Sequence, residues 1–442
     1  MKTPIYNFVK RYAKKDTTRF HMPGHKGKPF LGCEPSDITE IDGADVLYNA
    51  DGIIDLSEKN ATSLFGTAHT FYSAEGSSLS IKAMLALAAG RNEKPLFLAA
   101  RNAHKAFLFA AALLDAEIGW IYPAHFSHPC ACNITADDVR AALNCANRKP
   151  SAVFITSPDY LGNITDISGI AEVCHSTGVP LLVDNAHGAY LKFLKNDTHP
   201  ITLGADMCCD SAHKTLPVLT GGAYLHISKY CEKYVGHARD MLSVFASTSP
   251  SYLILQSLDM CNKYLSGSYR AKLEKTVKKV AEVTERLNKN GYSAQNTEPL
   301  KIVINTAKSG VDTEKTVRSL RRAGVEPEFY DRDYLVLMAS AENTARDFEK
   351  LLSALFPIKN KKRAAALPPE FKKPKQVLSV RKAIFAEYET LSIDAAIGKI
   401  CASPTVSCPP AVPIVVSGEL IDADAAKLLK YYGITKINVI KE

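Results

Sequence analysis

The sequence has few of the features that mark secreted, membrane or zinc-binding proteins. Its 11 cysteines include no Cys-x-x-Cys pair, and neither the adjacent Cys208 and Cys209 nor the pair Cys130 and Cys132 has a zinc-ligand spacing. The first residues form no apolar stretch of the signal-peptide type. The longest apolar run, 106–114, is too short to cross a bilayer. We therefore expect a cytoplasmic protein with reduced thiols, no bound metal and no membrane association.

A strong excess of one charge is also missing. The chain has 54 Lys and Arg against 46 Asp and Glu, a formal net charge of +8 over 442 residues. Two short basic runs, 359–363 and 372–375, hold part of the excess, and the first contains no aromatic residue. Such runs are far more often solvated faces or linkers than nucleic-acid contacts. We expect no nucleic-acid partner; a nucleic-acid binder would show a steep salt dependence of binding.

From about residue 95 the apolar pattern alternates between short buried runs and longer amphipathic ones. Helices are predicted at 103–114, after a capping Thr135, and at 167–176. The runs between them predict strands at 95–100, 117–122, 151–156, 180–184, 207–210 and 222–226. Strands separated by helices of this length indicate right-handed βαβ units. The sequence therefore predicts an α/β fold with a mainly parallel sheet.

The chain is long enough for more than one domain, and its texture changes after Pro250. Helices are predicted at 252–265 and 268–288, followed by a strand–helix–strand–strand–helix order up to residue 355. A stretch rich in Lys, Pro and Ala then resembles a linker. No internal repeat occurs. We predict an N-terminal segment (1–55), a large domain (56–290), a small α/β domain (291–357), a linker (358–376) and a C-terminal segment (377–442).

Polar residues follow several of the predicted strands. Asp184-Asn-Ala-His-Gly, Ser211-Ala-His-Lys-Thr and Arg101-Asn-Ala-His-Lys each come directly after a strand. Ligands in open α/β sheets bind at the carboxyl ends of strands, so these residues are candidates for a shared site. Gly76-Ser-Ser opens an apolar helix, 81–89, and such a start suits a phosphate, although a Ser-rich helix start is usually only a cap.

Asp184-x-Ala-His-Gly followed by Ser211-x-His-Lys214 resembles the fold-type I enzymes of pyridoxal 5′-phosphate (PLP). Further motifs narrow the resemblance to the ornithine/lysine/arginine decarboxylases, in the short bacterial form without an N-terminal receiver-like domain. It covers nearly the whole chain, and its motifs are Phe20-His-Met-Pro-Gly-His-Lys-Gly27, Phe65 to Ser73, Gly76-Ser-Ser, Arg101-Asn-x-His-Lys105, Ser247 to Leu253 and Ser257-Leu-Asp259. The resemblance implies a large domain of the seven-stranded PLP type with smaller α/β C-terminal domains.

The resemblance also implies roles for individual residues. Lys214 would hold the cofactor as a Schiff base, and Asp184 would keep its ring nitrogen protonated. His104 would stack on the ring and His187 would lie near it, while His213 and Lys214 are rival donors of the proton that replaces carbon dioxide. The phosphate would be bound by Gly76, Ser77, Ser78 and Ser211. Substrate contacts are expected at Arg381 and Glu419, for which a surface arginine and a structural turn are the alternatives.

The implied reaction is α-decarboxylation of lysine, arginine or ornithine to an amine, as in polyamine biosynthesis. The resemblance implies at least a homodimer, in which Ser247 to Ser249 reach the neighbour's phosphate. Two alternatives keep the fold or the cofactor: an aminotransferase or carbon–sulfur lyase, which would form other products, and a PLP-binding protein without catalysis.

Several positions depart from the family pattern. Asn185 stands where Glu is common, and Glu75 stands where Gln is common. Thr220-Gly-Gly replaces a more polar stretch, Cys408 takes the place of a Tyr before Pro-Pro, and Ala411 follows where Gly is usual. The first two are expected to lie beside the cofactor, and the last two weaken any conclusion about the substrate.

Overall fold

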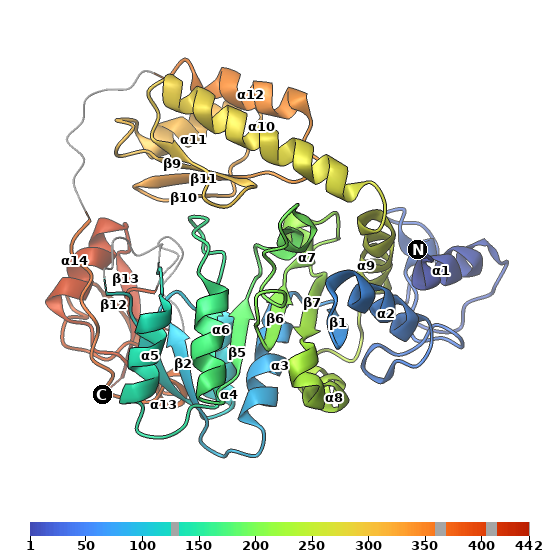
Figure 1. Cartoon of the computed structure of the whole chain (residues 1–442), viewed down its shortest axis with the longest axis horizontal. Helices are drawn as coiled ribbons and strands as arrows, with labels where there is room; N and C mark the ends of the chain where they lie inside the picture. The colour runs from blue at the N-terminus through green and yellow to red at the C-terminus, as the bar shows by residue number, and fades with distance from the viewer. Residues whose placement is uncertain (125–131, 359–367, 404–412, 442) are drawn as a thin grey trace. The chain divides into compact units, whose positions relative to one another are not determined.

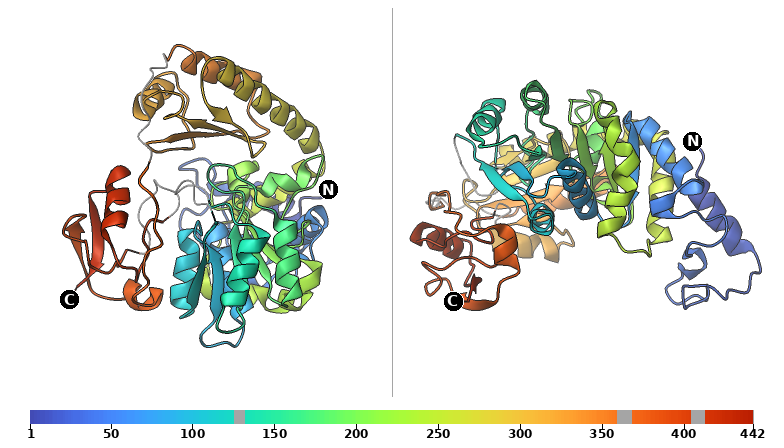
Figure 2. Two further views of the ribbon diagram at one scale, coloured as in Figure 1. Left: turned by 60° about the vertical axis from the view of Figure 1, so that its left-hand side comes forward. Right: turned by 90° about the horizontal axis from the view of Figure 1, so that it is seen from below.

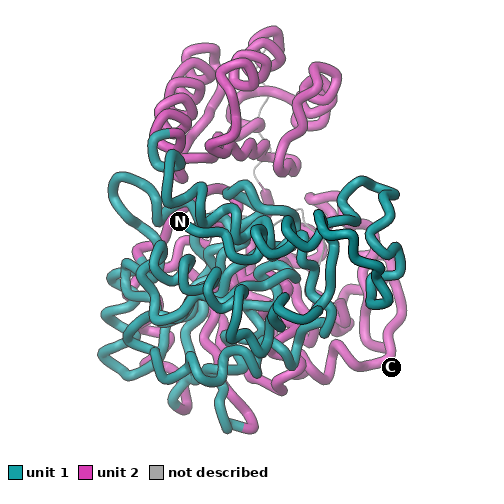
Figure 3. Tube along the Cα trace, turned by 90° about the vertical axis from the view of Figure 1, so that its right-hand side faces the viewer, with its two compact units in different colours: residues 1–92, 149–157, 167–271 teal, residues 93–148, 158–166, 272–442 magenta. Residues whose placement is uncertain are grey.

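The computed structural model describes residues 1–124, 132–358, 368–403 and 413–441 (Figures 1 and 2). The chain forms two compact units (Figure 3), which we describe separately. Unit 1 comprises residues 1–92, 149–157 and 167–271, and unit 2 comprises 93–148, 158–166 and 272–442. The five-part division predicted from the sequence stays a prediction.

Seven strands form the main sheet, in the order β1-β7-β6-β5-β4-β2-β3. β7 runs antiparallel to its neighbours β1 and β6, whereas β4, β5 and β6 are parallel to one another, as are β2 and β3. The predicted mainly parallel sheet is therefore confirmed. The strands are β1 (His69–Ser73), β2 (Leu96–Ala100), β3 (Glu117–Ile121), β4 (Ala152–Thr156), β5 (Leu181–Asp184), β6 (Met207–Asp210) and β7 (Ala223–Ile227).

Strand β1 was not predicted. Its sequence, His-Thr-Phe-Tyr-Ser, mixes polar and apolar residues without the apolar run that marks the other strands. It becomes a strand through tertiary contact, because it pairs along its whole length with β7. Thr70 and Ser73 are fully buried there, so a polar strand is accommodated inside unit 1.

The helices of unit 1 pack around its five strands. Helix α3 is apolar on nearly every side and is buried, and it contacts β6 and β7. Asp259 holds two other helices together: its carboxylate accepts the amide of Tyr6 (3.0 Å) and the hydroxyl of Ser57 (2.6 Å), and burial raises its pKa to about 6 despite these bonds. The helices are α1 (Pro4–Lys14), α2 (Ile53–Phe65), α3 (Ser77–Ala89), α6 (Ile167–Ser176), α7 (Ala212–Thr215), α8 (Val235–Phe245) and α9 (Tyr252–Leu265).

Unit 2 contains β2 and β3 with α4 (Lys105–Leu113) and α5 (Ala136–Cys145), and α5 begins at the predicted cap Thr135 in a capping box with Asp138. It also contains a four-stranded antiparallel sheet in the order β10-β11-β9-β8. Figure 1 shows α10, α11 and α12 on one side of this sheet. The elements are β8 (Ala294–Gln295), β9 (Lys301–Asn305), β10 (Phe329–Tyr330), β11 (Tyr334–Met338), α10 (Tyr269–Lys289), α11 (Thr313–Arg322) and α12 (Ala345–Leu355).

Lys301 is a charged residue at the start of β9 that has no solvent exposure. Its ammonium lies 2.6 Å from the equally buried Glu298 and donates to the carbonyl of Asp159 (2.9 Å). The other face of the four-stranded sheet packs Val303 and Val336 against Leu161. The 158–166 segment is thus held against this sheet by one hydrogen bond from the buried Lys301 and by one apolar cluster.

The last part of unit 2 has its own apolar core around a two-stranded antiparallel sheet (Figure 2). Helix α13 is not part of this core; it packs through Val380 against Leu108 and Ala112 of α4. The elements are α13 (Val380–Ile384), β12 (Tyr388–Ser392), α14 (Ala423–Tyr431) and β13 (Lys436–Ile440). Among all the described residues, no helix is both long and apolar enough to span a lipid bilayer.

Gly221 explains one departure from the family pattern. Its φ is +100°, and a Cβ there would lie 2.9 Å from the carbonyl oxygen of Ala74. Its own carbonyl accepts the amide of Gly76 at 2.7 Å. A side chain at this position is therefore excluded by both conformation and space, which accounts for glycine in Thr220-Gly-Gly.

Gly221→Ala is expected to destabilise the protein. The positive φ alone costs a side-chain-bearing residue about 1–2 kcal/mol, and the contact with Ala74 adds to this. Gly236→Ala is the control, because Gly236 lies in α8 and a Cβ there meets nothing within 4 Å. Thermal unfolding should show a lower midpoint for the first variant and an unchanged or slightly higher midpoint for the second. Equal midpoints would contradict this account of Gly221.

Candidate active site

Helix α3 begins at a turn that is suited to a phosphate. Gly76 precedes the helix with a φ of 72°, a conformation that favours glycine, and Ser77 and Ser78 are the first two helical residues. The hydroxyl of Ser211, just past β6, donates to the hydroxyl of Ser77 at 2.8 Å. Two predicted phosphate ligands that lie far apart in the sequence therefore meet at the positive end of a 13-residue helix.

Asp184 ends β5 and is only 2% exposed. One of its carboxylate oxygens accepts the amide of Ala186 (3.1 Å) and the thiol of Cys209 (3.6 Å). Because β5 and β6 are parallel neighbours, Asp184 and Ser211 lie at the same end of the sheet, where the carboxyl ends of these strands meet. A buried carboxylate at this end stabilises a positive charge placed beside it.

Lys214 lies in α7, the short helix that follows β6. Its ammonium group donates to Nε2 of His187 at 3.0 Å, so a predicted nucleophile and a predicted ring neighbour are in contact. The neighbouring His213 is fixed differently: its backbone amide (3.1 Å) and its ring Nδ1 (3.0 Å) both point at the carbonyl oxygen of Gly222. Nδ1 therefore carries the proton that is donated to this carbonyl.

The remaining predicted site residues belong to unit 2. His104 is the N-cap of α4, and its Nδ1 accepts the amide of Ala106 at 3.2 Å. Arg381 is exposed and donates to the carbonyl of Ala112 (2.9 Å) near the end of α4. Glu419 is buried in an ion pair with Arg101. The functional roles predicted for these residues stay predictions, and the departures at Cys408 and Ala411 lie outside the described residues.

Two family models cover most of the chain. "Orn/Lys/Arg decarboxylase, major domain" matches residues 3–315. The chain belongs to the Orn/Lys/Arg decarboxylase family. The model of the C-terminal domain of this family matches residues 360–438. The family resemblance noted in the sequence is confirmed, and the chain is a decarboxylase of the type that acts on basic amino acids.

Similar proteins agree with this assignment. The decarboxylase is 29% identical over 460 residues to an arginine decarboxylase of Bacillus subtilis, covering 95% of this chain and 91% of the relative. It is 28% identical over 460 residues to an arginine decarboxylase of Halalkalibacterium halodurans, with the same coverage. A solved lysine decarboxylase of Francisella novicida has a TM-score of 0.83 at 16% identity, over 99% of this chain and 81% of that one. A serine palmitoyltransferase of Sphingomonas wittichii has a TM-score of 0.58 at 14% identity, over 81% and 83%. These structures show a shared fold.

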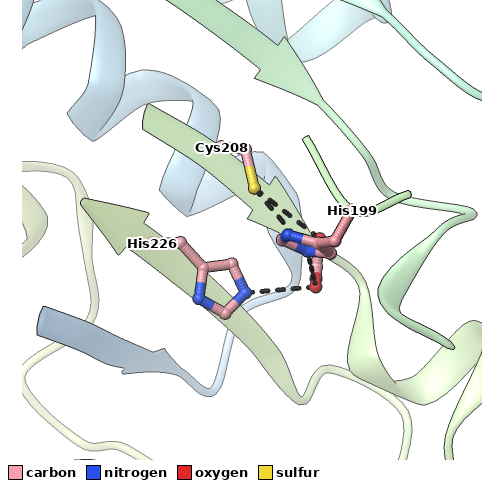
Figure 4. Close-up of side chains that lie close together, drawn as sticks. His199, Cys208 and His226 are labelled. Carbon is pink, nitrogen blue, oxygen red and sulfur yellow. Dashed lines mark hydrogen bonds and ion pairs between the residues drawn. The ribbon is translucent and has the colours of Figure 1, made fainter. Parts of the chain in front are cut away.

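Beside the predicted residues, the decarboxylase contains a buried network that the sequence analysis missed. The carboxylate of Asp210, the last residue of β6, is fully buried and accepts Nε2–H groups from His199 (3.0 Å) and His226 (3.1 Å). It also accepts the side-chain amide of Asn185 at 2.6 Å. Figure 4 shows the side chains of His199, Cys208 and His226, which lie close together in this network. The available signal was the spacing of Cys208 and Asp210, two residues apart on one face of β6.

Four of these side chains also have the ligand types of a zinc site, because their possible ligand atoms lie within 4.8 Å of one another. They are His199, Cys208, Asp210 and His226. The surroundings of His199 favour a hydrogen-bonded imidazole over a zinc-bound one. Its Nδ1 faces the amide N–H of Ile201 at 3.4 Å, so Nδ1 is the acceptor and Nε2 carries the proton. A zinc-bound imidazole has the opposite arrangement, with its second nitrogen donating. We therefore interpret the cluster as a hydrogen-bonded support for Asp210.

Asn185 and Glu75, the two departures expected to lie beside a cofactor, both have local partners. Asn185 can donate to Asp210, whereas a Glu in its place would bring a second negative charge to the same buried carboxylate. Glu75 accepts the backbone amide of Ser247 at 2.7 Å, which ties the turn before α3 to the 247–249 segment. A Gln could accept the same bond, so this contact does not require the acid.

Asp210→Asn is expected to lower stability by about 1.5–3 kcal/mol at neutral pH, because hydrogen bonds to an ionised carboxylate are lost. Burial alone would raise the pKa of Asp210, but His199 and His226 outweigh it and hold this pKa well below its usual range. The ionised Asp210 therefore stabilises the folded state fully above the unfolded-state pKa of about 3.9. This stabilisation is lost as the pH falls toward the folded-state pKa of Asp210.

The midpoints of thermal unfolding of the wild type and the variant should thus differ most near neutral pH. They should converge as the pH falls below about 4. The exposed Asp240 gives the control, Asp240→Asn, which should follow the wild type at every pH. A difference between wild type and Asp210→Asn that does not change with pH would refute the ionised state of Asp210.

Proposed function

We propose that this decarboxylase binds pyridoxal 5′-phosphate through Lys214 and removes the α-carboxyl group of a basic amino acid, with arginine as the first candidate. The observation that carries the proposal is that several predicted site residues lie together at the carboxyl end of the parallel strands of unit 1. The Lys214–His187 contact, the buried Asp184 and the Ser77–Ser211 pair all belong to that end. Arginine is chosen because the relatives covering nearly the whole chain include four that are named arginine decarboxylases.

The residues fit this cofactor. The helix start at Gly76 to Ser78, with Ser211, offers backbone N–H groups and hydroxyls to a phosphate. Asp184 offers a buried carboxylate to a protonated ring nitrogen, and Lys214 offers an amine to the aldehyde. When bound, PLP supplies an electron sink for the pair of electrons that carbon dioxide leaves behind. In the proposal, His104 covers the face of the ring.

Proton handling falls to the residues around Lys214. Its ammonium group lies 3.0 Å from Nε2 of His187, so a proton can pass between them within one hydrogen bond. The ring of His213 is held at Nδ1 by the carbonyl of Gly222, which leaves Nε2 as the ring nitrogen that can take part in proton transfer. Lys214 and His213 therefore both stay in the proposal as donors of the proton to the substrate carbon.

The proposal includes at least a homodimer, as the fold-type I resemblance implies. Three large apolar side chains of the N-terminal segment support a protein contact, because Phe20, Phe30 and Leu31 are 95%, 93% and 90% exposed. Residues 247–249 are also exposed, which agrees with their predicted contribution to a neighbour's phosphate site. The cytoplasmic location stays a prediction.

Lys214→Ala is expected to abolish both the visible absorbance of the bound cofactor and measurable turnover, because the amine that holds the aldehyde is removed. Lys195→Ala, an exposed lysine of the same unit, is the control and should retain both. Absorbance spectra and carbon dioxide release from the purified proteins check this. Near wild-type turnover in Lys214→Ala would remove Lys214 from the mechanism.

Substrate assays separate the proposal from its alternatives. Arginine, lysine and ornithine are supplied in turn, and carbon dioxide and the amine product are measured. We expect release of carbon dioxide with agmatine from arginine at the highest kcat/KM of the three. Formation of a 2-oxo acid would favour an aminotransferase, and a cofactor spectrum that no basic amino acid changes would favour a PLP-binding protein without catalysis.

A further inference from the structure

Arg101 and Glu419 form a buried ion pair between two parts of the chain that are 318 residues apart. The guanidinium donates to both carboxylate oxygens, with Nη1 to Oε1 at 2.6 Å and Nη2 to Oε2 at 2.8 Å. The side chains of Arg101 and Glu419 are 0% and 1% exposed. This two-bond geometry fixes orientation as well as distance.

The C-terminal segment surrounds the rest of the guanidinium. Its Nε donates to the carbonyl of Pro413 and its Nη2 to that of Ile414, both at 3.2 Å. Glu419 in turn accepts the backbone amide of Val416 at 2.8 Å. The indole of Trp120 lies 4.8 Å from the guanidinium carbon. Segment 413–419 is therefore folded around the head group of Arg101.

Arg101 opens the turn that carries His104. Its amide donates to the carbonyl of Ile121 (3.2 Å), and that of Ala103 donates to the carbonyl of Ala100 (3.1 Å). His104 then caps α4, where its carbonyl accepts the amide of Phe107 at 2.8 Å. Only two residues separate Arg101 from His104, so a shift of Arg101 displaces the imidazole.

Glu419 is poorly placed to receive a substrate cation. Its carboxylate already accepts two bonds from Arg101 and one from Val416 in a position without solvent. A cationic substrate group would have to replace the guanidinium, and this would leave Arg101 buried without its counter-charge, which is strongly unfavourable.

We propose that Glu419 is a positioning residue: through Arg101 it fixes the turn that carries His104, and it does not recognise the substrate. The C-terminal segment thereby becomes part of the machinery of the decarboxylase. This inference rests on the proposed function, because the task of His104 is to cover the cofactor.

Glu419→Gln tests the proposal, since it keeps the size of the side chain and removes its charge. Trp120 is the only tryptophan of the chain, so its fluorescence in cofactor-free protein reports on the guanidinium beside it. We expect a shifted emission, an altered circular dichroism of the bound cofactor, and a kcat reduced by up to about 10²-fold, the loss that a displacement of about 1 Å brings. The reduction should be the same for arginine, lysine and ornithine.

Two further variants guard against a general loss of structure. Glu298→Gln removes an equally buried carboxylate of unit 2, that of the Lys301 pair, and should leave the Trp120 emission and the cofactor dichroism unchanged. Arg101→Met with Glu419→Met replaces both charges by apolar side chains of similar length. We expect this pair to regain thermal stability relative to Glu419→Gln without regaining kcat.

The outcomes are distinct. A raised KM for one basic amino acid alone, with unchanged emission and dichroism, would mean that Glu419 recognises the substrate and would overturn the proposal. Unchanged kcat in Glu419→Gln, full kcat in the double methionine variant, or equal effects of Glu298→Gln would also overturn it. If the proposed function itself is wrong, the wild type will already fail to bind the cofactor or to release carbon dioxide.

Discussion

The buried negative charge of Asp210 constrains the end of the sheet on which the proposed site depends. A buried carboxylate is tolerated only when donors surround it, and here they come from three directions: Asn185 after β5, His199 before β6 and His226 on β7. Satisfying one charge thus fixes three chain segments relative to one another. Asp184 is the neighbour of one of these donors and Ser211 follows the carboxylate itself, so the placement of both follows from that requirement.

Unit 2 uses buried charge in the same way at two other places. Arg101 and Glu419 join the turn before α4 to residues 413–419, and Lys301 joins β9 to the 158–166 segment. Buried ion pairs add little net stability compared with apolar packing, but an incomplete pair is very unfavourable. Alternative arrangements of these segments are therefore penalised, and connections that are long in sequence acquire one defined position.

Most local elements could be predicted because local patterns decide them, whereas β1 was missed because its pairing with β7 decides it. The strand at 207–210 and the helix at 252–265 have the predicted bounds, since apolar runs and caps act within a few residues. The motifs likewise led to Lys214, His187, Ser77 and Ser211, which the structure brings into contact in pairs. The partners of Asp210 and Glu419 could not be predicted. Which polar groups share a buried position is decided by tertiary packing, and no periodicity within one segment encodes it.

The hydroxyl contact between Ser77 and Ser211 has a consequence for how the chain matures. The two residues are 134 positions apart, so their contact forms only after long-range loop closure, which is slower than the formation of local contacts. The α7 segment with Lys214, by contrast, closes onto β7 within about ten residues. In the proposed function, a cofactor that needs both parts can bind only after both contacts have formed. Such a cofactor would bind the native state and raise its population by mass action.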